Sequence, residues 1–243
     1  MIRRSLLLGV LGVLLVISAC SRLPGKPEPG PEVPRPDSVL NSAVLYAANC
    51  AGCHGATGKY GPAMDLSDPV YLAIVGDDTL RDTISRGRPG TAMSAFSRKQ
   101  GGMLTDEQIN SIIRGIREHW GNTSALAGVT PPSYTAPVTG NPQQGQAVYL
   151  TYCASCHGDN DKGGPKAGSV TNPSYLSLIS DQGLRTVVIA GRPDFGAPDW
   201  RSNVPGHPMS EQEISDVVAW LSSHRPMQSA ESNTANSSFG AMH

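Results

Sequence analysis

The sequence predicts an all-α protein built from two tandem helical modules, and three observations support this prediction. The chain repeats itself at an offset of about a hundred residues, the sign of a duplicated unit. Apolar residues recur at helical spacing near the end of each repeat. The 27 glycines and 20 prolines gather outside these periodic stretches, as expected of short helices joined by long irregular loops.

The repeat extends through most of both halves of the chain. The paired segments are 43–55 with 147–158, 60–62 with 163–165, 68–75 with 172–179, 80–89 with 184–193, and 104–116 with 209–221. Composition shifts then divide the chain into six parts. These are a signal peptide (1–19), a proline-rich linker (20–39), a first module (40–121), a linker (122–140), a second module (141–225) and a tail expected to be disordered (226–243).

The last helix of each module carries the clearest helix signals. Thr105 with Gln108, and Ser210 with Glu213, have the spacing of a capping box that starts a helix. The apolar positions that follow are Ile109, Ile112, Ile113 and Ile116 in the first module, and Ile214, Val217, Val218 and Leu221 in the second. We expect these faces to form the core of each module.

The N-terminus has the pattern of an export signal. Two arginines precede an apolar run, which ends on ISAC at residues 17–20. This ending resembles the lipobox of bacterial lipoproteins, in which the cysteine becomes a lipidated first residue, so we expect Cys20 to carry a lipid anchor. An ordinary signal peptide and an uncleaved anchor helix are the alternatives. All three place residues 21–243 in the cell envelope, facing the periplasm or the cell exterior.

Residues 23–37 form a spacer between this anchor and the first module. Prolines at their density favour an extended polyproline II conformation. The formal net charge of the chain is −1 and no basic run is present. Nothing in the charge pattern therefore indicates a nucleic acid partner.

Four of the five cysteines lie in two matching motifs, CAGCH at residues 50–54 and CASCH at residues 153–157. C-x-x-C-H is the attachment motif of c-type haem, in which both thiols form thioethers and the histidine binds iron. The motif residues are Cys50, Cys53 and His54 in the first module, and Cys153, Cys156 and His157 in the second. A thioredoxin-like pair or a structural zinc site gives no reason for a histidine after both pairs. We therefore predict two covalent haem c groups.

Each module resembles a class I cytochrome c domain, over about residues 40–120 and 141–225. The shared order is a short helix, C-x-x-C-H, a Gly-Pro, a loop with the distal iron ligand, and a C-terminal helix. In that family the Gly-Pro carbonyl accepts a hydrogen bond from the proximal histidine. The resemblance gives this role to Pro62 and Pro165. The alternative is that each proline simply ends a turn.

The resemblance also indicates the distal ligand of the first module. AMSAF, at residues 92–96, is similar to the Met-Pro-x-Phe ligand loop of the family, with Ser94 in place of the proline. Met93 is therefore the predicted ligand opposite His54, a pairing that raises the reduction potential. Met64 lies too close to the proximal motif, and Met103 lies against the last helix.

The second module departs from the pattern at this site. GRPDFGAPDW, at residues 191–200, matches GRPGTAMSAF, at residues 87–96, but has Ala197 where the first module has Met93. We rank Met209 first as the replacement ligand, although it aligns with Leu104 and can equally be a packing residue. His207 follows closely, and an open five-coordinate iron is the third possibility.

These features predict a membrane-anchored dihaem cytochrome c that transfers electrons and is not itself an enzyme. The expected partners are redox proteins, with a quinol-oxidising complex or dehydrogenase as donor and a terminal oxidase or reductase as acceptor. The alternative is a dihaem peroxidase or small-ligand sensor with an open second iron. The loop of the second module offers Asp194, Asp199 and Arg201 near that iron, without an obvious acid–base pair.

Overall fold

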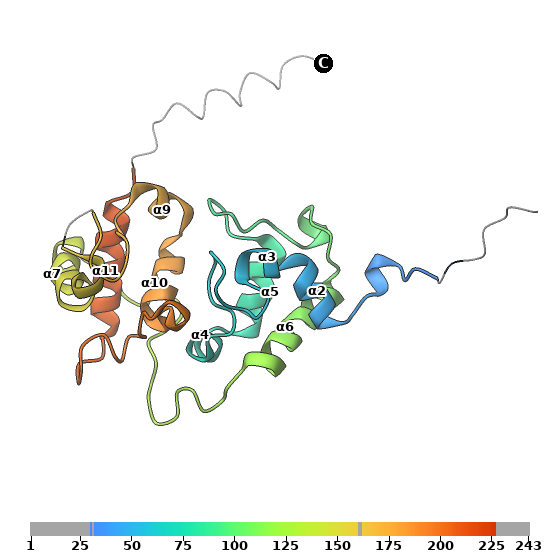
Figure 1. Cartoon of the computed structure of the whole chain (residues 1–243), viewed down its shortest axis with the longest axis horizontal. Coiled ribbons are helices and arrows are strands. Elements are labelled where there is room, and N and C mark those ends of the chain that lie inside the picture. The colour runs from blue at the N-terminus through green and yellow to red at the C-terminus, as the bar shows by residue number, and fades with distance from the viewer. Residues whose placement is uncertain (1–29, 31, 160–161, 227–243) are drawn as a thin grey trace, which may run out of the picture. The chain divides into compact units, whose positions relative to one another are not determined.

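The structure, a computed structural model, describes residues 30, 32–159 and 162–226. The predicted signal peptide, Cys20 and nearly all of the predicted tail lie outside these residues. The chain divides into two compact units, one ending at Ser38 and one beginning at Val39. The first unit contributes a described 3₁₀ turn, η2 (Pro36–Ser38). The second unit contains both predicted modules (Figure 1).

The all-α prediction is confirmed, and the two modules have the same five α-helices in the same order. In the first module these are α2 (Ser42–Asn49), α3 (Ala51–His54), α4 (Pro69–Ile74), α5 (Asp77–Arg86) and α6 (Asp106–Trp120). In the second they are α7 (Pro142–Tyr152), α8 (Ala154–His157), α9 (Pro173–Leu178), α10 (Asp181–Ala190) and α11 (Glu211–Ser223). Short 3₁₀ turns, η3 (Arg98–Gln100) and η4 (Pro193–Phe195), lie in the distal loops. Among the described residues there is no β-strand, only isolated bridges.

Side-chain caps explain where the helices begin. Asn41 and Asn141 accept hydrogen bonds from the first backbone N–H groups of α2 and α7. Asp68 and Asn172 do the same for α4 and α9, each of which starts with a proline. The two predicted capping boxes of α6 and α11 are both present, with the side-chain and the backbone hydrogen bonds formed.

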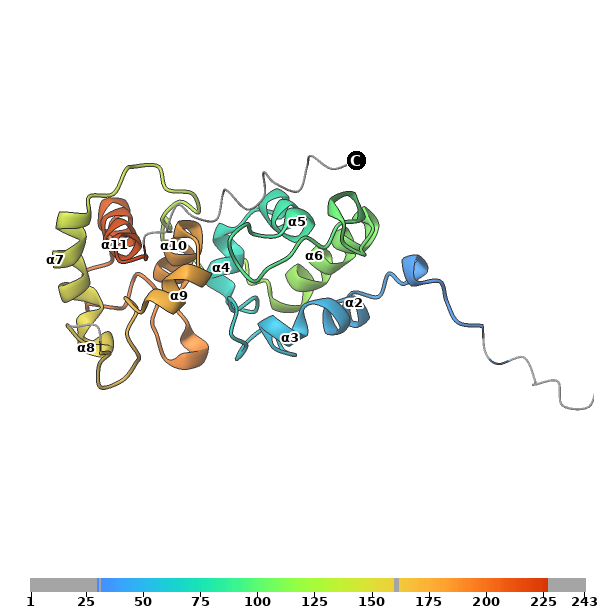
Figure 2. The same cartoon turned by 90° about the horizontal axis from the view of Figure 1, so that it is seen from above.

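The predicted apolar faces of α6 and α11 form the core of each module. All eight of their isoleucine, valine and leucine positions are buried. Helix α6 packs against α2 and α5, and α11 packs against α7 and α10. Figures 1 and 2 show α7 lying next to α11 and crossing it. The N-terminal and C-terminal helices of each module therefore hold the attachment motif against the core.

The same helix crossing is built in opposite ways in the two modules. In the first, Gly115 on α6 faces Ser42 on α2, and a Cβ placed on this glycine would lie 2.5 Å from the Ser42 hydroxyl oxygen. In the second, Gly145 on α7 faces α11, and a Cβ there would lie 2.6 Å from the Trp220 Cβ. Counted from the attachment cysteines, Ser42 and Gly145 are equivalent positions. Each crossing thus needs one small residue, and the two modules place it on opposite helices.

The modules touch each other inside the second unit, where α4 of the first contacts α10 of the second. The linker between them is held by both. The Arg88 guanidinium donates to the Tyr134 hydroxyl at 2.7 Å, and the Gln182 amide donates to the Tyr134 carbonyl at 2.7 Å. No helix in the described ranges is long and apolar enough to cross a membrane.

Candidate functional site

The two C-x-x-C-H motifs form the same short helical turn in each module. Cys50 ends α2 and begins α3, which closes on His54, and Cys153 and α8 repeat this arrangement. The first and second cysteines are three residues apart on a helical turn, so both thiols face one side. None of the four cysteines in the described part of the chain forms a disulfide. Each turn therefore presents two thiols and one imidazole together.

A backbone carbonyl fixes the orientation of each motif histidine. The Nδ1 atom of His54 lies 2.7 Å from the Met64 carbonyl oxygen, and Nδ1 of His157 lies 2.8 Å from the Gly168 carbonyl oxygen. When Nδ1–H donates to such a carbonyl, Nε2 carries the lone pair that binds a metal ion. Both histidines are therefore held in the tautomer that suits an iron ligand.

These acceptors correct one expectation from the sequence. The carbonyl partners of His54 and His157 are not Pro62 and Pro165, but residues two and three positions further along. The reason is that the chain folds back over the attachment turn after each proline. Ala63 N–H donates to the Cys53 carbonyl at 3.0 Å, and this contact directs the following carbonyls toward the imidazole.

Two tyrosines that the sequence analysis did not single out hold the same turns. The Tyr46 hydroxyl donates to the Gly55 carbonyl at 2.9 Å, and the Tyr149 hydroxyl donates to the Gly158 carbonyl at 2.6 Å. Both tyrosines are buried and both stand four residues before the first motif cysteine. Each one ties the N-terminal helix to the residue that follows the motif histidine.

Burial shifts the pKa values of three motif side chains, those of His54, Cys50 and Cys153. It lowers the pKa of His54, with the Arg192 cation acting in the same direction, so the neutral ligand form is favoured. Burial, followed by the neighbouring motif cysteine, raises the pKa of Cys50 to about 11 and that of Cys153 to about 12. Activated redox cysteines have lowered pKa values, so a thioredoxin-like pair does not fit.

The two pairs of cysteines also do not assemble into a zinc site. Across the described ranges, no group of three or more cysteine, histidine or acidic side chains is close enough to hold a metal ion. Each turn instead offers two adjacent thiols beside an apolar core, together with a histidine whose Nδ1 is hydrogen-bonded to a backbone carbonyl. This donor set fits a haem that is attached through both thiols and bound on one face by the histidine.

The distal segments of the two modules have matching backbones. Arg88 N–H donates to the Met93 carbonyl at 2.8 Å, and Arg192 N–H donates to the Ala197 carbonyl at 3.0 Å. Phe96 and Trp200 each donate from the backbone to the helix before them at 3.1 Å. Ala197 therefore occupies the structural position of Met93, as the aligned sequences indicated. Met93 itself is half-buried and packs against the core.

The two candidate ligands of the second module lie in different environments. Met209 is 3 % exposed, and its backbone N–H donates to the Trp200 carbonyl at 2.9 Å. Leu104 is 5 % exposed and makes the matching bond to Phe96 at 2.8 Å, so Met209 occupies the place of Leu104 in the core. His207 is exposed, in a turn closed by its own N–H on the Val204 carbonyl at 3.0 Å.

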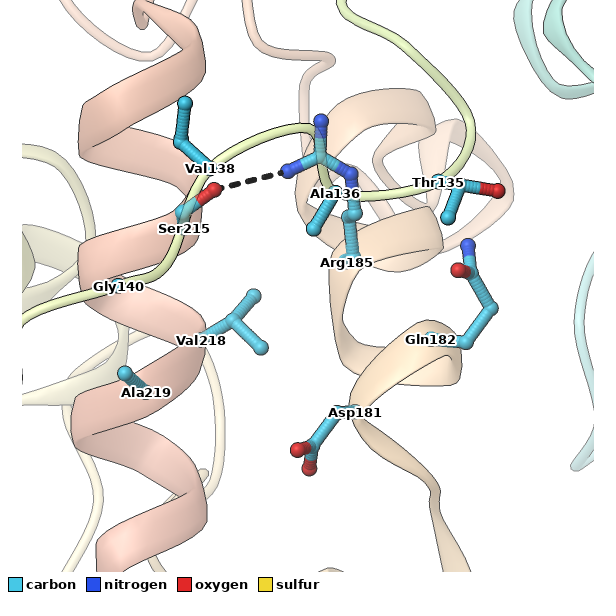
Figure 3. A pocket seen from close by; sticks show the side chains of 10 residues that line it. All are labelled: Thr135, Ala136, Val138, Gly140, Asp181, Gln182, Arg185, Ser215, Val218 and Ala219. Carbon is cyan, nitrogen blue, oxygen red and sulfur yellow. Dashed lines mark hydrogen bonds between the residues drawn. The ribbon is translucent and has the colours of Figure 1, made fainter.

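A shallow hollow of about 250 Å³ lies away from these motifs, between the linker and helices α10 and α11. Figure 3 shows the Arg185 side chain crossing it toward Ser215. The buried Arg185 guanidinium pairs with Glu211 and donates twice to the Ser133 carbonyl, at 2.9 and 3.0 Å. No cysteine or histidine lines the hollow. Arg185 therefore anchors the linker to the second module.

A known protein family matches both modules. The family described as "Cytochrome C oxidase, cbb3-type, subunit III" matches residues 38–114 and 140–221. These two segments contain the two C-x-x-C-H motifs.

Individual relatives include both electron-transfer subunits and an enzyme. The cbb3-type cytochrome c oxidase subunit CcoP of Azospirillum sp. is 32 % identical over 142 residues, which are 54 % of this chain and 43 % of that protein. The cytochrome bc1 complex cytochrome c subunit of Mycobacterium tuberculosis is 23 % identical over 227 residues, 90 % of this chain and 77 % of that protein. A thiosulfate dehydrogenase of Psychrobacter arcticus is 40 % identical over 72 residues, 28 % of this chain and 22 % of that protein. The chain thus spans less than half the length of two of these relatives.

Proposed function

The chain belongs to the family of cbb3-type cytochrome c oxidase subunit III, and we propose that it carries electrons between redox partners of a bacterial respiratory chain. Membership over both segments gives the protein two covalent haem c groups, one in each module. The observation that carries the proposal is the repeated attachment turn. In both copies two thiols stand beside a histidine whose Nδ1 is bound to a backbone carbonyl.

In the first module, each residue of the site has a defined role. Cys50 and Cys53 hold the haem through thioethers, and His54 is the proximal ligand. The Met64 carbonyl keeps the imidazole in the binding tautomer. Met93 would supply the second protein ligand, from a loop in which the Arg88 N–H donates to the Met93 carbonyl. When bound, the haem iron gains and loses one electron, while the protein orients and tunes it.

In the second module, Cys153, Cys156 and His157 take the corresponding roles. We keep Met209 as the proposed sixth ligand, with His207 and an open position as the alternatives. Because Met209 occupies the place of Leu104, Met209→Leu is the sharpest test: it removes the sulfur and keeps the packing. A ligand role predicts that this variant converts the second haem to high spin. An unchanged spin state rejects Met209, and His207→Ala then decides between the other two.

The anchor and the partners are part of the same proposal. Lipidation of Cys20 would tether the modules to a membrane and raise their effective concentration near membrane complexes. The names of the relatives, a cbb3 oxidase subunit and a bc1 complex subunit, support a terminal oxidase as acceptor and a quinol-oxidising complex as donor.

The direct test is the mass and redox titration of the full chain, produced together with a haem maturation system. We expect two haem groups per chain, and one after Cys50→Ala with Cys53→Ala. Met93→Ala should lower the potential of one haem by about 60 mV or more. For one electron this corresponds to at least a tenfold change in the reduction equilibrium constant. A purified chain without covalent haem would falsify the proposal.

An enzymatic role is the second candidate, and one observation favours it. Ala197 stands in the structural place of Met93, so the second iron has no ligand from this position. A dihaem peroxidase or small-ligand sensor needs such an open iron. Cyanide or carbon monoxide binding to the second haem, together with turnover of peroxide, would support this candidate. Two low-spin haems that bind neither ligand would exclude it.

A further inference from the structure

The segment of the second module that precedes Ala197 contacts the first module. Arg192 and Asp194 form an ion pair at 2.8 Å, with side chains 16 % and 1 % exposed. An almost fully buried carboxylate is costly unless every oxygen is satisfied. Here one oxygen accepts from Arg192 Nε at 3.0 Å and the other accepts from Arg192 Nη2.

The remaining contacts of this pair reach across to the turn after the first attachment motif. Tyr60 N–H donates to the Asp194 carboxylate at 3.0 Å, and Arg192 Nη2 donates to the Gly61 carbonyl at 3.1 Å. The Phe195 ring lies edge-on to the Tyr60 ring, with centroids 6.3 Å apart. The guanidinium carbon of Arg192 lies 4.6 Å from the Phe195 ring centre, within cation–π range.

Tyr60 shows that this contact shapes the first module. Among the described residues it is the only non-glycine with positive φ, at 65°. Its counterpart is Gly163, with φ of 90°, so the turn itself suits glycine. A tyrosine there is disfavoured, and its side chain is 62 % exposed, so burial does not hold it. Its contacts are the hydrogen bond to Asp194, the ring contact with Phe195, and Lys59 Nζ at 5.3 Å from its ring centre.

Gly61 connects this contact to the proximal ligand. A Cβ on Gly61 would lie 2.7 Å from the His54 carbonyl carbon, so its backbone is packed directly on the attachment turn. The Arg192 cation therefore contacts Gly61, and the Gly61 backbone in turn packs on the turn that carries His54. Arg88, the equivalent of Arg192 in the first module, donates instead to the hydroxyls of Tyr134 and Ser180.

We propose that Arg192 and Asp194 are positioning residues that clamp the two modules together, and that their charges set the reduction potential of the haem in the first module. This inference rests on the proposed function. A cation near the iron disfavours the more positive ferric form and raises the potential, whereas an anion lowers it. The first haem is thus tuned by side chains of the second module.

The two members of the pair give a test that separates charge from packing. Arg192→Ala leaves the Asp194 anion unpaired, and should lower the reduction equilibrium constant of the first haem by about threefold to tenfold, or about 30–60 mV. Asp194→Asn leaves the Arg192 cation unpaired, and should raise it by a similar factor. The double variant removes both charges and should lie between the two single variants, displaced from the wild type by the difference between the two effects. The first haem is identified as the one whose potential Met93→Ala changes.

Two controls complete the experiment. Arg86→Ala removes the same charge from an exposed pair with Asp82, in which the side chains are 67 % and 66 % exposed, and should cause a much smaller shift. Hydrogen exchange of the segment around Tyr60 in the full chain should be faster in Arg192→Ala than in the wild type.

The outcomes are distinguishable. Shifts of one sign in both single variants, or no shift in either, would overturn the tuning role. Unchanged exchange around Tyr60 would overturn the clamp. The proposed function fails separately, if the chain carries no covalent haem, and the exchange measurement still reports on the clamp in that case.

Discussion

The crossing of α7 and α11 gives the most direct test of how the modules are packed. Gly145→Ala adds a single methyl group to α7 at a position that faces α11. The added Cβ would lie 2.6 Å from the Trp220 Cβ and equally close to the Asp216 carbonyl carbon. Carbon atoms pack at about 3.5–4.0 Å, so the helices have to separate by about 1 Å.

The size of the effect follows from two opposing contributions. Forcing an extra methyl group into a packed core costs about 1–3 kcal/mol, or more where backbone blocks relaxation, as Asp216 does here. Replacing glycine by alanine inside a helix returns about 1 kcal/mol. Because the Asp216 backbone blocks relaxation, we take the upper part of this range, about 2–3 kcal/mol, and expect a net loss of about 1–2 kcal/mol. In a unit of this size that loss lowers the melting temperature by about 2–8 °C.

The assay is thermal unfolding of the haem-loaded chain, followed by circular dichroism and by haem absorbance. The matched control is Gly52→Ala, because Gly52 is also helical but has no neighbouring atom within 4 Å of an added methyl group, and its counterpart is the exposed Ser155. The control should change the melting temperature little. If Gly145→Ala proves as stable as the wild type, the close approach of α7 and α11 is wrong.

Three further predictions concern the sites. In the Met209→Leu background, Ala197→Met should restore a sulfur ligand and raise the potential of the second haem by about 60 mV or more relative to Met209→Leu alone, measured by spectroelectrochemistry; an unchanged potential would contradict its equivalence to Met93. Tyr46→Phe should cost about 1 kcal/mol in thermal unfolding, through loss of the hydrogen bond to Gly55, and equal stability would contradict its anchoring role. Burial raises the pKa of Asp68 to about 6 from 3.8, so the folded state holds this proton more tightly than the unfolded state. The contribution of Asp68 to stability therefore falls as pH rises from about 4 to 6. Asp68→Asn still caps α4 and should reduce this pH dependence of the melting temperature between about pH 4 and 7. If the pH dependence persists in the variant, it belongs to other groups.

Much of the fold could be predicted because it depends on sequence patterns that span only a few residues. The capping boxes, the apolar faces of α6 and α11 and the attachment motifs depend on residues within a few positions of each other. The equivalence of Met93 and Ala197 was also visible, because the flanking GRP and aromatic residues fix the alignment. The tyrosines that hold the attachment turns were in reach as well. Tyr46 and Tyr149 both stand four residues before the first motif cysteine. Segments 43–55 and 147–158 differ in length by one residue, so an alignment that starts from their first residues does not pair the two tyrosines.

Other features depend on how the chain folds back on itself. The acceptors for His54 and His157 are Met64 and Gly168, because the turn after each proline brings their carbonyls to the imidazole. Spacing alone did not indicate this. The pairing of Asp194 with Tyr60 joins residues 134 positions apart, and no pattern within either repeat announces it. The positive φ of Tyr60, where the repeat has a glycine, coincides with that contact.

The contacts of the linker decide which part of this protein can be moved to another protein as a unit. Tyr134 is held by Arg88 from one module and by Gln182 from the other, and Ser133 is held by Arg185. A proteolytic nick in the exposed stretch 121–124 would therefore leave both fragments associated. A gene fusion that carried one module alone would separate the linker from the side chains of the other module that bind it. The natural building block for grafting this electron carrier onto another scaffold is the pair of modules with its connecting segment intact.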